Sequence, residues 1–204
     1  MDPFQSKTSL TPIRQVEAYW TALCQGTRLP RRSEIDPKAI FDALKHTFII
    51  ERIAPGIARI RVAGQALHRT TGLDLWGMPL TCLFTPAGRT ALHSVCERLF
   101  DAPATLTLRL GVAGSDTLAA HMVLLPLTDD SGQINRAIGV LVDTGTQNST
   151  AVRYDIADSE LRQIEAQGLA KEAVTPAEKA QGFAETQAPF TPKRAHLRLV
   201  YSGS

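Results

Sequence analysis

The chain has 204 residues, of which 44% are hydrophobic and 21% are charged, as in an ordinary globular protein with one domain and extensions. Its 22 basic and 20 acidic side chains leave a net charge of +2, and no apolar run approaches the roughly 20 residues that span a bilayer, so we expect neither a nucleic-acid partner nor membrane insertion. Three cysteines far apart in the sequence, Cys24, Cys82 and Cys96, argue against a disulfide framework and favour a cytoplasmic location.

Residues 1–12 are polar, and we expect them to form a flexible N-terminus. An amphipathic helix follows, because Ile13, Val16, Trp20 and Leu23 recur at intervals of three and four residues. Two interpretations of this apolar stripe stay open: the helix packs on its own domain, or it forms a seam with a second copy or a signalling partner. The four residues are therefore candidates for a dimer or partner contact.

The N-terminal helical segment, residues 13–46, continues with a basic loop and a second helix. Arg31 and Arg32 either form a site for a phosphate or a partner, or pair with nearby carboxylates. Asp36 followed by Pro37 is typical of a helix start, because the carboxylate caps free N–H groups and proline suits the first turn. The residues of this helix expected to face the core are Ile40, Phe41 and Leu44.

Residues 47–143 show the alternating pattern of β-strands, interrupted by a helical middle. Residues 47–53 and 57–63 form a hairpin around a turn with type II chemistry. Residues 65–84 are broken by glycine and proline, so two short helical turns are predicted there, and a longer helix begins at Pro86. Three more strands are predicted at 105–110, 118–127 and 134–142. The fold class is α+β, a five-stranded antiparallel sheet with helices on one face, preceded by the N-terminal amphipathic helix.

Residues 144–204 are predicted to form a linker, a short helix and a C-terminal tail. The short helix begins at Asp158 or Ser159. Residues 172–192 are poor in large apolar side chains, so we expect them to be disordered. The last run, 196–201, alternates like a single strand, which is stable only when it adds to the edge of a sheet.

The order of two strands, a helical middle and three strands resembles a PAS domain. The residues that carry this resemblance most clearly are R-V-A-G at 61–64 and T-G-L-D-L-W-G-M-P-L at 71–80, which matches the G-x-D-x-x-G-x-x-L segment of PAS domains. Upstream, Trp20 followed by L-P-R-R-S-E-I-D-P at 29–37 resembles PAS family 5, a protein family of alphaproteobacteria. The resemblance spans residues 16–143 and implies a PAS core at 47–143 that serves as a cytoplasmic sensory or interaction module, with a homodimer or signalling protein as partner.

We predict no enzymatic activity, because no catalytic constellation is recognisable. The five histidines fall on different predicted elements without the H-x-x-x-H spacing of a metal site, so no metal site is expected. No Walker, GxSxG or GxGxxG motif occurs. The Asn-Cys pair of flavin photosensors among the similar domains is missing, and Cys82 lies outside such a context.

PAS-like folds enclose a mainly apolar cavity between helices and sheet, where a small apolar ligand can bind. Some haem-binding PAS domains ligate iron through a histidine on the long helix, and His93 occupies that position. A haem or small-molecule receptor is therefore the alternative to an adaptor without a cofactor. The alternative for the apolar candidates is that they form the plain core of the domain, and for His93 that it is a hydrogen-bonded structural residue. The side chains expected to line the pocket are Trp76, Met78, Phe84, Leu92, His93, Cys96, Met122 and Val140.

Overall fold

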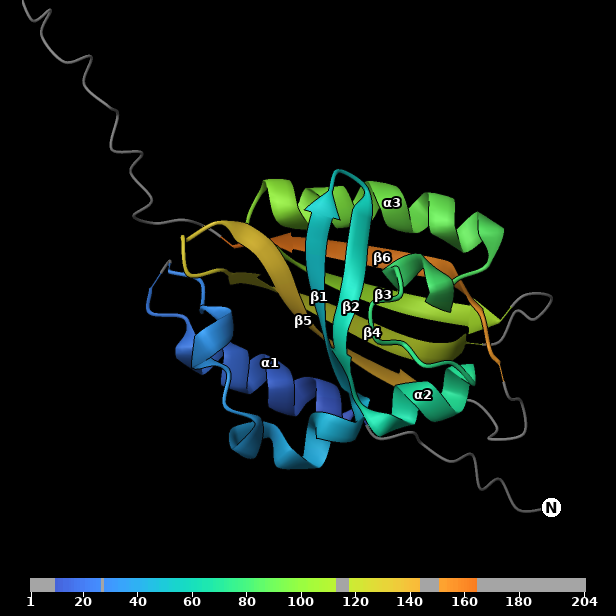
Figure 1. Cartoon of the computed structure of the whole chain (residues 1–204), viewed down its shortest axis with the longest axis horizontal. Coiled ribbons are helices and arrows are strands. Elements are labelled where there is room, and N and C mark those ends of the chain that lie inside the picture. Colours follow the sequence, from blue (N-terminus) through green and yellow to red (C-terminus); the bar gives the residue numbers. More distant parts are fainter. Residues whose placement is uncertain (1–9, 27, 113–117, 144–150, 165–204) are drawn as a thin grey trace, which may run out of the picture. The chain divides into compact units, whose positions relative to one another are not determined.

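The computed structural model of the chain describes residues 10–26, 28–112, 118–143 and 151–164. These residues form a six-stranded sheet of order β2-β1-β5-β4-β3-β6, in which every neighbouring pair is antiparallel (Figure 1). The predicted α+β class with an antiparallel sheet is confirmed, and the sheet has one strand more than the five expected. The predictions for residues 1–9, 172–192 and 196–201 lie outside the described residues.

The first five strands lie in the regions where the sequence predicts strands. They are β1 (Thr47–Ala54), β2 (Ile57–Ala63), β3 (Ala104–Val112), β4 (Leu118–Thr128) and β5 (Ile134–Asp143). The turn between β1 and β2 holds Gly56 at a φ of +72°, the positive value that a type II turn requires at its third residue. Pro126 lies in β4 beyond Leu124, the last residue that pairs with β3, so the proline occurs where that ladder has ended.

A sixth strand, β6 (Tyr154–Gln163), replaces the short helix expected in this region. It pairs with β3 along its whole length, and Asp158 lies opposite Arg109 in the ladder. Tyr154 anchors its start, because the side chain is fully buried and the backbone carbonyl accepts the N–H of Thr85 at 3.0 Å. The helix predicted to begin at Asp158 or Ser159 is wrong, and the sheet extends beyond residue 143, into the segment expected to be linker and tail.

One face of the sheet, the inner face, carries the helical middle and the long helix. These elements are α2 (Gln65–Thr71), the 3₁₀ turn η3 (Leu80–Leu83) and α3 (Pro86–Asp101). Thr85 caps α3 by accepting the N–H of Gly88 at 3.1 Å. A Cβ at Gly88 would lie 2.7 Å from the carbonyl oxygen of Tyr154, so glycine allows α3 to approach β6 closely.

The opposite face of the sheet, the outer face, is covered by the N-terminal segment. It comprises α1 (Thr11–Leu23) and two 3₁₀ helices, η1 (Arg32–Glu34) and η2 (Pro37–His46). Figure 1 shows α1 and η2, both blue, next to each other and away from α3. Helices therefore cover both faces rather than one, because β4 and β5 are also apolar on this side, where the buried residues include Val123, Leu125, Ile138 and Val140.

The apolar stripe of α1 packs on its own sheet. Ile13, Val16 and Trp20 are buried, Leu23 is half-buried, and the Trp20 indole N–H donates to the carbonyl oxygen of Pro126 at 2.9 Å. This arrangement corresponds to the first of the two interpretations of the stripe. Because the sheet covers these three side chains, they cannot contact a partner in this arrangement. The helix also begins at Thr11, inside the N-terminus that was expected to be flexible.

The helix η2 differs from expectation in which side chains it buries. Asp36 caps it as predicted, accepting the N–H of Lys38 at 2.9 Å. Ile40 is buried, whereas Phe41 is 73% exposed, so the prediction that Phe41 faces the core is wrong. The reason is the 3₁₀ geometry, with three residues per turn, which places Ile40 and Ala43 on the buried side and turns Phe41 away. Among the helices of the described residues, none is long and apolar enough to span a membrane.

Candidate functional site

The residues expected around an inner pocket lie in three different environments. Those that pack together in the core between α3 and the sheet are Met78, Phe84, Leu92, Cys96 and Met122. Trp76 is 74% exposed, because it follows a turn in which the Asp74 carboxylate accepts the Trp76 N–H at 3.2 Å. Val140 is buried on the outer face, in the core beneath α1 and η2. The structure therefore keeps Trp76 and Val140 apart from the inner group.

The space beside the inner group is small. A hollow of about 80 Å³ is bounded by Gly56, Leu92, His93 and Cys96 among others. An apolar cavity that admits benzene has a volume of about 150 Å³, so this hollow is too small for a haem. His93 is itself exposed, and a side chain at Gly56 would overlap its imidazole. The alternative of haem ligation by His93 thus lacks space in this arrangement.

A larger cavity, of about 360 Å³, lies on the outer face between η2 and the β1–β2 end of the sheet. Small-molecule sites typically have volumes of about 300–1,000 Å³, so this cavity lies within their range. We name it the outer groove. Its walls and rim include Arg32, Ile40, Leu44, Lys45, Ile49, Val62, Gln65 and Ile138.

The register of the sheet explains why the outer groove is apolar. Ile49 on β1 lies opposite Val62 on β2 and opposite Ile138 on β5, so three apolar side chains form a row across the outer face. The helices cover this row only in part, because Ile138 is buried whereas Val62 is 51% exposed. The groove is the space left where the helical layer ends before the edge strand β2.

The next row of the same face is ionic. Glu51 Oε2 accepts a hydrogen bond from Arg61 Nε at 2.5 Å, and Glu51 Oε1 accepts one from an Arg136 guanidinium nitrogen at 2.9 Å. Burial acts to raise the pKa of Glu51, but the hydrogen bonds from the two arginines outweigh it and hold the pKa below its usual value. This row holds one carboxylate between two guanidinium groups and borders the apolar row of the groove.

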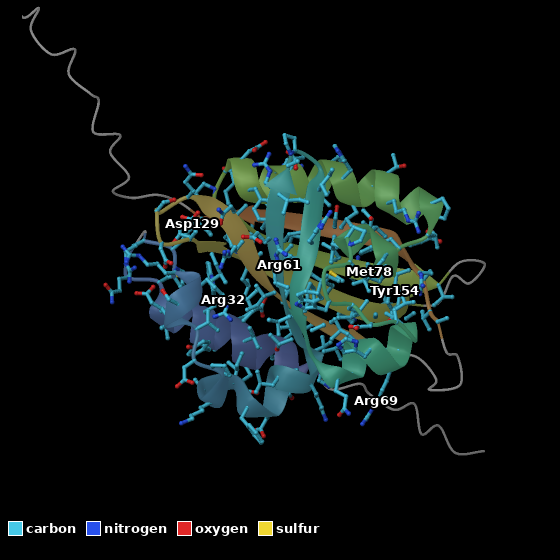
Figure 2. All side chains as sticks on the ribbon, in the orientation of Figure 1. Arg32, Arg61, Arg69, Met78, Asp129 and Tyr154 are labelled. Atoms are coloured by element: carbon cyan, nitrogen blue, oxygen red, sulfur yellow. The ribbon has the colours of Figure 1, made fainter. Side chains whose placement is uncertain are left out.

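The end of η2 is held firmly against the hairpin. The Gly64 N–H donates to the Thr47 carbonyl oxygen at 2.8 Å, and Thr47 Oγ1 donates to the Ala43 carbonyl oxygen at 2.9 Å. A side chain at Gly64 would overlap the backbone of Leu44 and Lys45. These contacts fix one wall of the outer groove before any ligand arrives. In the view of Figure 2, Arg32 lies between α1 and the β1–β2 hairpin, on the other side of that hairpin from Met78 and Tyr154.

Comparison with known proteins assigns the chain to a family. The family model of PAS family 5, described as a PAS domain, matches residues 8–142. The chain belongs to this PAS family. The protein is therefore a PAS domain with a sensory role in signalling, and its N-terminal helix lies within the matched region. The search of curated proteins found no match.

Solved structures similar to this PAS domain include light-oxygen-voltage (LOV) domains. One, a LOV domain studied with a flavin analogue, is 21% identical with a TM-score of 0.41, over 52% of this chain and 82% of that chain. The light-state structure of the blue-light photoreceptor aureochrome1 LOV is 20% identical with a TM-score of 0.39, over 52% of this chain and 86% of that chain. An RNA-binding LOV receptor is 22% identical with a TM-score of 0.38, over 56% of this chain and 36% of that chain. These likenesses are too weak to transfer a ligand or partner to the PAS domain.

The outer groove was not among the sites that the sequence suggested. One signal for it is present in β1, where residues 47–50 are buried on both sides of the strand instead of alternating between buried and exposed. A strand buried on both faces requires a second covering layer, and a gap in that layer is a candidate pocket. Arg32, which the sequence singled out as a possible anion or partner site, lies at this gap.

The thiols of the PAS domain are poor nucleophiles. Burial, with a smaller contribution from Glu97, raises the pKa of Cys96 to about 12. Burial also raises the pKa of Cys24 to about 11, against an opposing effect of Arg28. Both thiols therefore stay protonated near neutral pH. Within the described residues, no three side chains of the metal-binding types gather where a metal ion would fit.

Two histidines with lowered pKa values should make the stability of the domain depend on pH. Burial and the neighbouring Lys45 lower the pKa of His46, partly offset by a backbone hydrogen bond of Leu141, and burial and Arg109 lower the pKa of His121. The unfolded chain therefore binds more protons than the folded chain once the pH falls through the ordinary histidine value of 6.5. The free energy of unfolding should decrease as the pH drops from about 8 to about 5.5.

Urea denaturation across this pH range checks the expectation. The double variant His46→Gln, His121→Gln should show a smaller decrease in the free energy of unfolding than the wild type, because it lacks both titrating groups. Equal decreases in the two proteins would assign the pH dependence to other groups.

Proposed function

We propose that this PAS domain is a non-enzymatic sensory or adaptor module of the bacterial cytoplasm that binds a small apolar molecule in the outer groove. Its output is contact with another protein, either a second copy of itself or a signalling protein. The observation that carries the proposal is the outer groove, an apolar cavity of about 360 Å³ walled by the sheet and by η2. The inner hollow beside His93, at about 80 Å³, offers no comparable space.

The helix η2 is suited to transmit occupancy of the groove to the surface. It consists of two short 3₁₀ helices joined at a kink, where Ile40 departs from helical dihedrals at φ −118° and ψ 27°. Ile40 lines the groove, whereas the adjacent Phe41 is 73% exposed. A ligand that prefers one position of Ile40 therefore biases where Phe41 is presented to a partner.

A fluorescence experiment with a neutral probe tests the groove. The full chain is titrated with N-phenylnaphthylamine, whose emission rises when it enters an apolar site, and native mass spectrometry looks for a co-purified adduct. The variant Val62→Trp places a large side chain at the exposed edge of the groove and should weaken probe binding at least about tenfold. Its matched control is Ile53→Trp, a substitution at an exposed position of β1 outside the groove lining, which should leave binding unchanged.

Two outcomes would contradict the proposal. One is the absence of both probe binding and an adduct in the wild-type chain. The other is probe binding that Val62→Trp and Ile53→Trp affect equally, because the probe would then occupy a different site.

A further inference from the structure

The charges on the outer groove are all of one sign. Its lining is apolar except for a few polar groups, and the charged residues within it are Arg32 and Lys45. Among the described residues, no aspartate or glutamate contributes to the lining. An apolar body with a basic rim matches a ligand that combines an apolar chain with a negative charge.

Neither of these cations is neutralised by the protein. Some arginines of the domain have a carboxylate partner: Arg28 lies 2.9 Å from Glu34 Oε1, and Arg61 and Arg136 share Glu51. Within the described part of the chain, the side chains of Arg32 and Lys45 form no ion pair. Arg32 is also half-buried, so water screens its charge less than that of a fully exposed arginine.

The carboxylate nearest to Arg32 in sequence is engaged elsewhere. Glu34 binds the Arg28 guanidinium through both oxygens, at 2.9 and 3.2 Å, and its Oε2 also accepts the backbone N–H of Arg31 at 2.7 Å. These bonds hold the pKa of Glu34 below its usual value, and Glu34 does not line the groove. The local ion pair thus leaves Arg32 free to meet an external anion.

We infer that the outer groove binds a free amphipathic carboxylate of medium chain length. The apolar chain lies over Ile40, Ile49 and Ile138, and the carboxylate binds at the rim formed by Arg32 and Lys45. The inference rests on the proposed function, because it names the ligand class of the same groove. The inference adds that the ligand must carry a negative charge, which the proposed function does not require.

The test compares ligands that differ only in their head group. Binding of decanoate, decanol and decylamine to the full chain is measured by displacement of N-phenylnaphthylamine and by calorimetry. Decanoate should bind at least about tenfold more tightly than decanol, and decylamine should bind more weakly than either. Arg32→Gln and Lys45→Gln should each reduce this preference for decanoate while leaving decanol affinity unchanged.

A matched control removes the same charge outside the groove. Lys38 lies on η2 and is exposed, but it does not line the groove. The variant Lys38→Gln should therefore keep the preference for decanoate. Thermal unfolding of each variant confirms that its fold is retained.

The outcomes separate the inference from the proposed function. If the neutral probe and decanol bind as tightly as decanoate, the groove is an apolar site and the carboxylate inference is overturned while the proposed function stands. If neither the probe nor any of the three ligands binds, both fail. Affinities that fall as the protein concentration rises would assign the groove to a second copy of the chain and would also overturn the inference.

Discussion

Trp20→Ala is expected to lower the free energy of unfolding by about 3–5 kcal/mol, as large-to-small substitutions of buried aromatic residues do. The Trp20 side chain is buried between α1 and the outer face of the sheet, and its indole N–H donates to the Pro126 carbonyl oxygen at 2.9 Å. Its removal leaves a cavity and deprives a buried carbonyl group of its donor. Urea denaturation measures the change.

The second tryptophan of the chain is a matched control. Trp76→Ala makes the same substitution at a side chain that is 74% exposed, so the free energy of unfolding should change by less than about 0.5 kcal/mol. Trp20→Phe keeps most of the packing and should cost about 1 kcal/mol, mainly for the lost hydrogen bond. If Trp20→Ala were no more destabilising than Trp76→Ala, α1 would not pack on its own sheet in solution. The interpretation of its stripe as a partner seam would then be favoured.

The elements that the sequence predicted correctly are those in which one residue pattern dominates. The stripe of α1 has helical spacing, and the alternation in β3 separates buried Leu106 and Leu108 from half-buried Thr105 and Thr107. Local chemistry also placed the hairpin turn at Gly56. In these segments, local preference and tertiary packing favour the same structure.

The prediction failed at β6 because local preference and tertiary context disagree there. Asp158, Ser159 and Glu160 are typical of a helix start, and they are exposed in the structure. Only long-range pairing with β3 makes this segment a strand, and an edge strand tolerates such polar residues on its open side. A single sequence does not reveal a pairing between segments about fifty residues apart.

The location of the candidate site was missed for a related reason. The alternation in the strands assigns each side chain to one of two faces, but it does not say which face encloses a cavity. Val62 follows the pattern of an ordinary strand residue, and Ile40 that of a buried helical residue. The outer groove arises only when η2, with its 3₁₀ geometry, leaves the β2 edge partly uncovered, and this depends on packing rather than on local pattern.

Tyr154→Ala should lower the free energy of unfolding by about 3–5 kcal/mol and loosen β6 from the sheet. The side chain is fully buried in the inner core, where its hydroxyl donates to Asp143 Oδ2 at 3.3 Å. Its backbone carbonyl accepts the N–H of Thr85 at the start of α3. Tyr154 therefore joins the first residue of β6 to two other parts of the domain, and truncation removes the apolar part of that anchor.

Amide hydrogen exchange locates the effect within the sheet. In Tyr154→Ala, the β6 amides should exchange faster relative to those of β1 and β5, because β6 is an edge strand paired only with β3 among the described residues. Tyr154→Phe keeps the ring and loses only the hydroxyl, so it should cost about 1 kcal/mol and leave β6 protected. Unchanged protection of β6 in Tyr154→Ala would mean that the backbone ladder with β3 holds the strand without this anchor. The close approach of α3 to β6 at Gly88 would then be a consequence of the paired strand rather than one of its supports.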